Sequence, residues 1–136
     1  GVLLVLDLDG LKRVNDMHGH DAGDAVLTEI SDRFRSAIRA EDVAGRIGGD
    51  EFVILIDRLD ADQHKARDKA LQMANKLINL VNIPCNYDGY SLHVGASIGL
   101  CLLGFEHLNP DVAINKADIA MYQAKKNGKG KAVFSA

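Results

Sequence analysis

Two pairs of acidic residues carry the chemistry that this sequence suggests. Asp50 and Glu51 lie in Gly48-Gly-Asp-Glu-Phe52, between the apolar runs 43–47 and 52–56. Two glycines between strand-like segments predict a tight β-hairpin, with glycine allowing a positive φ or the close approach of a ligand. Adjacent carboxylates on a rigid turn need a cation, and Mg²⁺ prefers oxygen ligands near phosphate groups. The alternative is an exposed Gly-Gly turn followed by surface acids.

The second pair is Asp7 and Asp9, directly after the apolar residues 1–6. This run predicts a strand buried on both faces, although its pattern alone also fits a buried helix. Open α/β sheets bind ligands at the carboxyl ends of their strands, so Asp7 is a candidate ligand. Because Gly10 is expected to begin a turn, only Asp7 is assigned to the strand. Asp9 is interpreted as a cap of the helix that follows.

The elements that must position these acids are predicted from hydrophobic periodicity. Strands are expected over 1–7, 43–47, 51–56, 91–104 and 131–135, and helices over 11–17, 21–38, 62–82 and 110–127. Asn86-Tyr-Asp-Gly89 predicts a hairpin turn, with room for a further short strand before it. The hairpin at 43–56 must be antiparallel, whereas crossover helices imply parallel pairs. The order therefore predicts an α/β sandwich with a mixed central sheet.

Bulk composition fits one soluble domain of 136 residues, with 47% hydrophobic and 26% charged residues. A net charge of −3 argues against nucleic acid as a partner, including a templated nucleotidyl transfer. Two cysteines form neither a zinc site nor a disulfide framework, and both are predicted to be reduced, with Cys101 in the core. No signal peptide or long apolar run is present. We therefore expect a cytoplasmic domain that does not itself contact a membrane, whether or not the parent protein is anchored in one.

The ordered series of motifs resembles the GGDEF domain family, the diguanylate cyclases. The matching segments are Asp7-Leu-Asp-Gly-Leu-Lys12, Asn15-Asp16, Gly19-His20, Gly23-Asp24, Arg39-Ala-Glu-Asp42, Arg46, Gly48-Gly-Asp-Glu-Phe52, Ala96-Ser-Ile-Gly99, Ala117-Asp-Ile-Ala-Met-Tyr122 and Lys125. They cover nearly the whole chain in the family's order and spacing. The resemblance implies one GGDEF domain over 1–136, with a palm-like α/β sandwich, a mixed five-stranded sheet surrounded by helices, and the GGDEF motif on a β-hairpin.

The resemblance also implies an activity and its residues. Two GTP molecules would be joined into cyclic di-GMP with loss of two pyrophosphates, with Mg²⁺ or Mn²⁺ as cofactor. Asp50 and Glu51 would be the catalytic residues, and Glu51 would act as a metal partner or as the general base. The implied metal ligands are Asp7, Leu8, Asp50 and Glu51. The implied GTP contacts are Gly10, Leu11, Lys12, Asn15, Asp24, Gly48, Gly49, Lys125 and Lys129.

Two smaller sites are implied as well. Asn15 and Asp24 would read the guanine edge, since a carboxylate accepts from its N–H groups and an amide meets the remaining edge. Arg39 and Asp42 would form an inhibitory product site, because a guanidinium suits a phosphate or a guanine. The alternative for Arg39 and Asp42 is a salt bridge at a helix C-terminus.

The chain departs from the family pattern in three places. Leu11 replaces the usual phenylalanine, and Lys129 stands where arginine is usual, which removes a bidentate contact. The family's N-terminal helix is absent, so the chain resembles a trimmed domain from a longer protein with linked sensor or phosphodiesterase domains. A second GGDEF domain would complete the active site. The alternative function is a regulatory module that binds GTP or cyclic di-GMP and controls a neighbouring domain.

Overall fold

A computed structural model describes residues 1–57, 59–104 and 109–135. Its elements in chain order are β1 Val2–Asp9, α1 Leu11–His18, α2 His20–Ala37, β2 Val43–Arg46, β3 Glu51–Ile56, α3 Gln63–Asn82, β4 Cys85–Tyr87, β5 Tyr90–Leu92, β6 Gly95–Leu102, α4 Pro110–Lys126 and β7 Ala132–Phe134. Within those ranges no helix is both long and apolar enough to cross a membrane.

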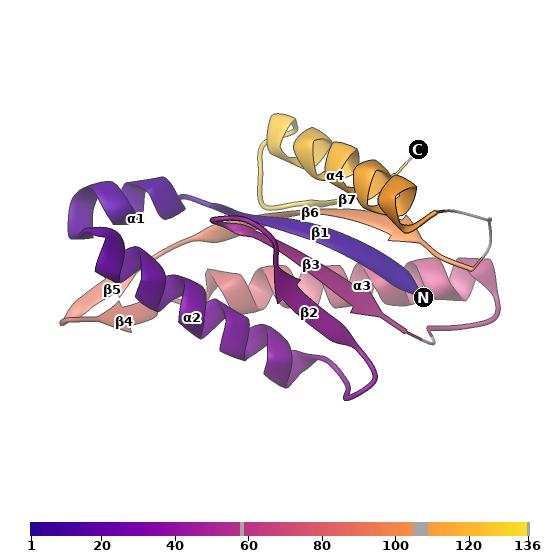
Figure 1. Cartoon of the computed structure of the whole chain (residues 1–136), viewed down its shortest axis with the longest axis horizontal. Coiled ribbons are helices and arrows are strands. Elements are labelled where there is room, and N and C mark those ends of the chain that lie inside the picture. The colour runs from indigo at the N-terminus through magenta and orange to yellow at the C-terminus, as the bar shows by residue number, and fades with distance from the viewer. Residues whose placement is uncertain (58, 105–108, 136) are drawn as a thin grey trace.

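The central sheet has five strands in the order β2-β3-β1-β6-β7 (Figure 1). β1 lies in the middle and pairs antiparallel with β3 and β6, and β2 pairs antiparallel with β3. Only β7, which follows the crossover helix α4, is parallel to its neighbour β6 among the described strands. The predicted mixed five-stranded sheet is therefore confirmed, with one parallel pair.

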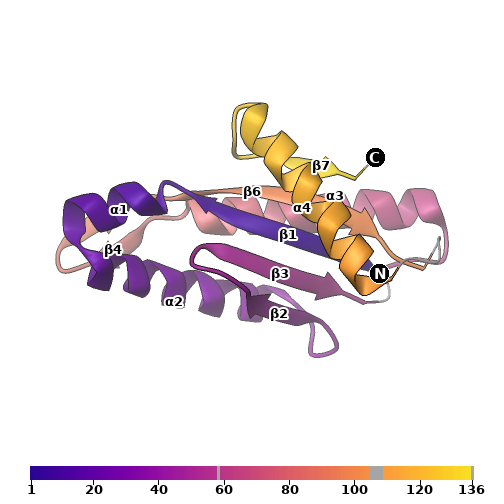
Figure 2. The same ribbon diagram turned by 45° about the horizontal axis from the view of Figure 1, so that its top comes forward.

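Helices cover both faces of the sheet (Figure 2). α2 and α3 pack on one face in a large core, and α4 packs alone on the other face against a smaller core that includes Cys101 and Met121. Side chains of a strand alternate between the two faces. In β1, Leu4, Leu6 and Leu8 join the core under α2 and α3, whereas Leu3 and Val5 face α4. The same alternation carries Asp7 and Asp9 to the α4 side.

A close approach between β6 and α4 depends on Gly99. A Cβ at this position would lie 1.8 Å from the Ala117 carbonyl oxygen and 2.4 Å from the Met121 nitrogen. No side chain fits there unless the helix backbone moves. Gly99 thus sets how near α4 lies to the strand ends that carry the acids.

Several predicted details are wrong. Asp9 is the last residue of β1 and does not cap α1, whose N-cap is Gly10 at φ 92 with no side-chain hydrogen bond. The predicted strand 91–104 is two strands, β5 and β6, separated at residues 93–94. The hairpin turn at 86–89 and the short strand before it are confirmed. The other predicted boundaries agree with the observed ones to within two residues, and the strand 51–56 matches β3 at both ends.

Candidate active site

The carboxyl end of β1 and the β2–β3 hairpin lie together. Asp7 is directly opposite Glu51 in the sheet, and the Leu8 amide donates to the Asp50 carbonyl at 3.0 Å. The chain turns over residues 47–50, and the Ile47 amide donates to the Glu51 carbonyl at 3.0 Å. The sheet pairing therefore brings the two acidic clusters of the sequence into one site.

The glycines of the hairpin do not have the backbone role that the sequence suggested. Neither Gly48 nor Gly49 is among the residues with positive φ. A Cβ at Gly49 would meet nothing within 4 Å, and one at Gly48 would make only an ordinary contact with Glu51. Neither the backbone conformation nor packing within the chain requires glycine at these two positions. The open space in front of the turn is therefore available to a ligand.

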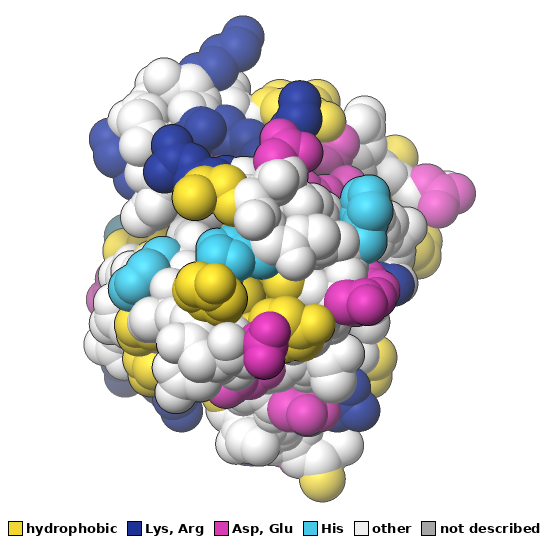
Figure 3. Space-filling view, turned by 90° about the vertical axis from the view of Figure 1, so that its left-hand side faces the viewer, with side chains coloured by type: hydrophobic (Ala, Val, Ile, Leu, Met, Phe, Trp, Pro, Cys, Tyr) yellow, Lys and Arg dark blue, Asp and Glu magenta, His cyan; other side chains and the backbone are white. Residues whose placement is uncertain are grey.

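Lys125 reaches into this site from the last turn of α4. Its ammonium lies 3.0 Å from Asp7 Oδ2 and 3.4 Å from Asp9 Oδ1. Burial alone would lower the pKa of Lys125, but its contacts with Asp7 and Asp9 outweigh burial and raise that pKa. In Figure 3, Lys and Arg side chains gather near the top of the view beside acidic ones, at the end of the molecule where α4 stops.

The acids perturb one another. Burial raises the pKa of Asp7, and the nearby Asp50 raises it further, while Lys125 acts in the opposite direction. Burial also raises the pKa of Glu51 to about 7, with Asp118, Asp7 and Asp50 adding to the effect. Clustered carboxylates share this behaviour because each disfavours the charge of its neighbours. Such perturbation is common where a protein holds a cation or performs acid–base chemistry.

Asp118 is a member of the site to which sequence reasoning gave no role. It lies on α4, close enough to interact with Glu51, and its Oδ1 is buried without a hydrogen-bond partner. A signal was present in the sequence. Asp118 lies at the edge of the apolar stripe of its helix, and Lys125 lies seven residues later, two turns along the same face.

Divalent metal ions fit the donors present. Asp7 Oδ1 is buried and makes no hydrogen bond, so one oxygen remains free beside the one that contacts Lys125. Carboxylate oxygens suit Mg²⁺ or Mn²⁺. Across residues 1–57, 59–104 and 109–135, no three His, Cys, Asp or Glu side chains are already grouped to hold a metal. A metal here would therefore also need backbone carbonyl or water oxygens.

Residues expected at the guanine base lie at the α1–α2 junction. A Cβ on Gly23 would fall 1.8 Å from Asn15 Oδ1, so the Asn15 amide rests directly against the backbone of α2. Asp24, the next residue, is exposed. Gly10 precedes α1 at φ 92, and the first intrahelical bond is donated by Val14. The amides of residues 11–13 therefore lack helical partners and can bind an anion.

The remaining candidate phosphate contacts are less enclosed. Lys12 and Lys129 are exposed. Lys129 follows α4 in a left-handed conformation, with φ 64, and its amide donates to the Ala124 carbonyl at 3.1 Å. A left-handed conformation is costly for a residue other than glycine, asparagine or aspartate, which makes the loop at 128–131 a defined feature rather than a frayed helix end.

Arg39 and Asp42 lie at the opposite end of β2 from the acids. The Asp42 carboxylate is buried and accepts from the amides of Arg39 and Asp57, at 3.0 and 2.9 Å. The Arg39 guanidinium contacts Glu41, Asp42 and the Asp57 carbonyl. The salt bridge considered as the alternative is thus present, and Asp42 holds the loop that presents Arg39.

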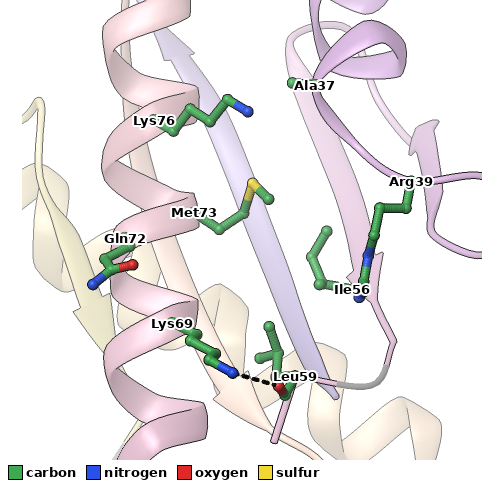
Figure 4. A pocket seen from close by; sticks show the side chains of 8 residues that line it. All are labelled: Ala37, Arg39, Ile56, Leu59, Lys69, Gln72, Met73 and Lys76. Atoms are coloured by element: carbon green, nitrogen blue, oxygen red, sulfur yellow. Dashed lines mark hydrogen bonds between the residues drawn. The ribbon is translucent and has the colours of Figure 1, made fainter.

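A hollow of about 450 Å³ opens beside Arg39 (Figure 4). Its other side is formed by α3, which contributes Lys69, Gln72, Met73 and Lys76. Lys69 is paired with Asp60 at 3.0 Å and also donates to the Leu59 carbonyl. Three cations around an open hollow with an apolar floor suit an anionic ligand that also has a flat hydrophobic part.

Fold and site together define a GGDEF domain. Residues 1–131 match the family described as "Diguanylate cyclase, GGDEF domain", and this chain belongs to that family. The GGDEF domain of TpbB (YfiN) from Pseudomonas aeruginosa superposes with a TM-score of 0.90 at 34% identity, over 99% of this chain and 76% of that one.

Curated relatives include proteins that make and degrade cyclic di-GMP. The bifunctional diguanylate cyclase/cyclic di-GMP phosphodiesterase MucR of Pseudomonas aeruginosa is 41% identical over 93% of this chain and 18% of its own length. Diguanylate cyclase A of Treponema denticola is 31% identical over 98% of this chain and 34% of its own length. This chain therefore spans about a third or less of these two relatives.

Proposed function

We propose that this domain condenses two GTP molecules into cyclic di-GMP with a divalent metal, as one half of a dimeric active site. The observation that carries the proposal is the meeting of Asp7, Asp50 and Glu51 at the end of β1, facing Lys125. Acids and a cation at a strand end next to free helix amides suit a nucleotide triphosphate and its metal.

Each residue has a defined part in this proposal. Asp7, Asp50 and the Leu8 carbonyl would hold Mg²⁺ or Mn²⁺, with Glu51 as a further ligand or as the general base. The metal would supply positive charge against the charge that develops on the phosphates. The amides after Gly10, together with Lys12, Lys125 and Lys129, bind phosphate oxygens. Asn15 and Asp24 hold guanine, and the space before Gly48 and Gly49 admits the nucleotide.

The reaction itself needs two domains. The 3′-hydroxyl of one GTP attacks the α-phosphorus of the other, the new P–O bond forms, and the bond to the bridging oxygen breaks to release pyrophosphate. The hydroxyl proton would pass to a base, for which Glu51 is the candidate because it lies on the hairpin directly opposite Asp7. In the second step, the 3′-hydroxyl of the other nucleotide attacks the remaining α-phosphorus, which closes the ring and releases the second pyrophosphate.

Product inhibition is proposed at the second site. Arg39 binds cyclic di-GMP, and the neighbouring hollow with Lys69 and Lys76 accommodates the rest of the ligand. Asp42 acts by holding the loop, because its carboxylate is already bonded to two amides. The distance between the two ends of β2 separates this site from the substrate.

A regulatory module that binds nucleotide without turning it over is the second candidate. Two observations favour it: Lys125 contacts Asp7, the expected metal ligand, and a relative combines cyclase and phosphodiesterase activities in one longer protein. In that case the domain would act on covalently linked sensor or phosphodiesterase domains.

The deciding experiment measures product formation in an enforced dimer. A coiled coil fused before Gly1 brings two domains to an effective concentration of about the mM range. The fusion is incubated with GTP and Mg²⁺ or EDTA, and cyclic di-GMP is quantified by chromatography. The matched control is Glu51→Gln in the same fusion, which should bind GTP and form little product. An enforced dimer that binds GTP yet makes no cyclic di-GMP would refute the cyclase and favour the regulatory module.

A further inference from the structure

Asp9 is an acidic residue of the site to which the proposed function gives no role. It ends β1 on the face toward α4, two residues beyond Asp7. Its Oδ2 accepts a hydrogen bond of 2.8 Å from the hydroxyl of Ser97, which is completely buried on β6. Because a buried hydroxyl on a central strand cannot follow a moving partner, this bond fixes the orientation of the Asp9 carboxylate.

The other oxygen of Asp9 faces Lys125. The separation between Asp9 Oδ1 and the ammonium is 3.4 Å, which is an ion pair but longer than a usual hydrogen bond, and Oδ1 is buried without a hydrogen-bond partner. Lys125 instead makes its short contact with Asp7, at 3.0 Å. Asp9 thus holds an unused acceptor within a small movement of the ammonium.

A divalent cation on Asp7 would compete directly with Lys125. Both positive charges need the same carboxylate, and like charges at such distances repel strongly in a partly buried site. Without a second acceptor, Lys125 would be driven into solvent and lost to the phosphates. Asp9 provides that acceptor at the place where the ammonium already lies.

We propose that Asp9 is a positioning residue for Lys125, braced by Ser97. When a divalent cation takes Asp7, the ammonium transfers its short contact to Asp9 Oδ1 and directs its remaining N–H groups to the triphosphate. This inference rests on the proposed function, since it assumes that GTP and a metal bind here. In this role Asp9 binds Lys125, and it neither ligates the metal nor caps α1.

A double-mutant cycle tests the assignment by calorimetry of GTP binding in Mg²⁺. Asp9→Asn keeps the size of the side chain and removes its charge, and Lys125→Met removes the ammonium. Each single variant should weaken GTP binding about tenfold, the size expected for one lost charge-assisted hydrogen bond. The double variant should bind no more weakly than Lys125→Met alone, because the two residues act as a unit. Additive losses would overturn the proposal.

Further measurements separate the other roles that Asp9 could have. Mn²⁺ affinity, followed by electron paramagnetic resonance without nucleotide, should be compared in the Lys125→Met background, where no ammonium competes for Asp7. In that background Asp9→Asn should change Mn²⁺ affinity little, and a large loss would make Asp9 a metal ligand. Ser97→Ala should weaken GTP binding when Lys125 is present, as Asp9→Asn does. In the Lys125→Met background, Ser97→Ala should leave GTP binding unchanged. A loss in both backgrounds would make the Ser97–Asp9 pair structural. If wild type itself does not bind GTP, the proposed function fails, whereas GTP binding with additive losses refutes only the role of Asp9.

Discussion

Replacing Gly23 by alanine should separate stability from nucleotide recognition. In the structure, the added Cβ would lie 1.8 Å from Asn15 Oδ1 and 2.8 Å from its Cγ. The atoms in the way belong to the end of a flexible side chain, so Asn15 can rotate away while both helices keep their places. The amide that is expected to meet guanine would then point elsewhere.

The two effects have opposite signs. Alanine within a helix is more favourable than glycine by roughly 0.5–1 kcal/mol, so Gly23→Ala should unfold at an equal or higher temperature than wild type. Loss of the contact between Asn15 and guanine should weaken GTP binding by about 1–2 kcal/mol, which is about tenfold in Kd. A variant that is more stable yet binds more weakly is not expected from a general packing defect.

Calorimetry of GTP binding and thermal unfolding followed by circular dichroism measure the two effects. Asn15→Ala is the matched control, because it removes the amide and leaves room for the new methyl group. The double variant Asn15→Ala with Gly23→Ala should bind GTP no more weakly than Asn15→Ala alone. Wild-type GTP affinity in Gly23→Ala would refute the reasoning, since Asn15 could not then contact guanine from its observed position.

Three further predictions concern packing, protonation and regulation. Gly99→Ala should lower the free energy of unfolding in urea by about 3 kcal/mol or more, because its Cβ meets helix backbone; Gly45→Ala, with nothing within 4 Å, should change it little. The pKa of Glu51 is raised from 4.5 to about 7, so its contribution to stability is present below pH 4.5 and is lost as pH rises through about 7. Glu51→Gln should remove this loss of unfolding free energy, which is about 1 kcal/mol after solvent screening. The same pH dependence of the unfolding free energy in both proteins would contradict the prediction. Arg39→Ala should weaken cyclic di-GMP binding at least tenfold and leave GTP binding nearly unchanged, whereas equal loss of both ligands would indicate a structural arginine.

Local patterns in the sequence were sufficient for most of the fold. Apolar periodicity identified the long helices and the central strands, because a helix or strand that buries one face must repeat its apolar residues at a fixed spacing. The acidic motifs identified Asp7, Asp50 and Glu51 as members of one kind of site. Boundaries are less accurate, and the predicted role of Asp9 is wrong, because β1 continues through Asp9 up to the turn at Gly10.

Contacts between distant residues were decided only by the tertiary structure. The pairing of β1 with β3 places Asp7 opposite Glu51, and the closeness of α4, allowed by Gly99, brings Asp118 and Lys125 to the same acids. The pKa of Glu51 depends on burial and on charges far away in the chain, which no local pattern encodes. The sequence by itself therefore determined which residue types and which elements this protein has. Tertiary structure decided which of those side chains meet, because sheet register and helix packing act between segments that are far apart along the chain.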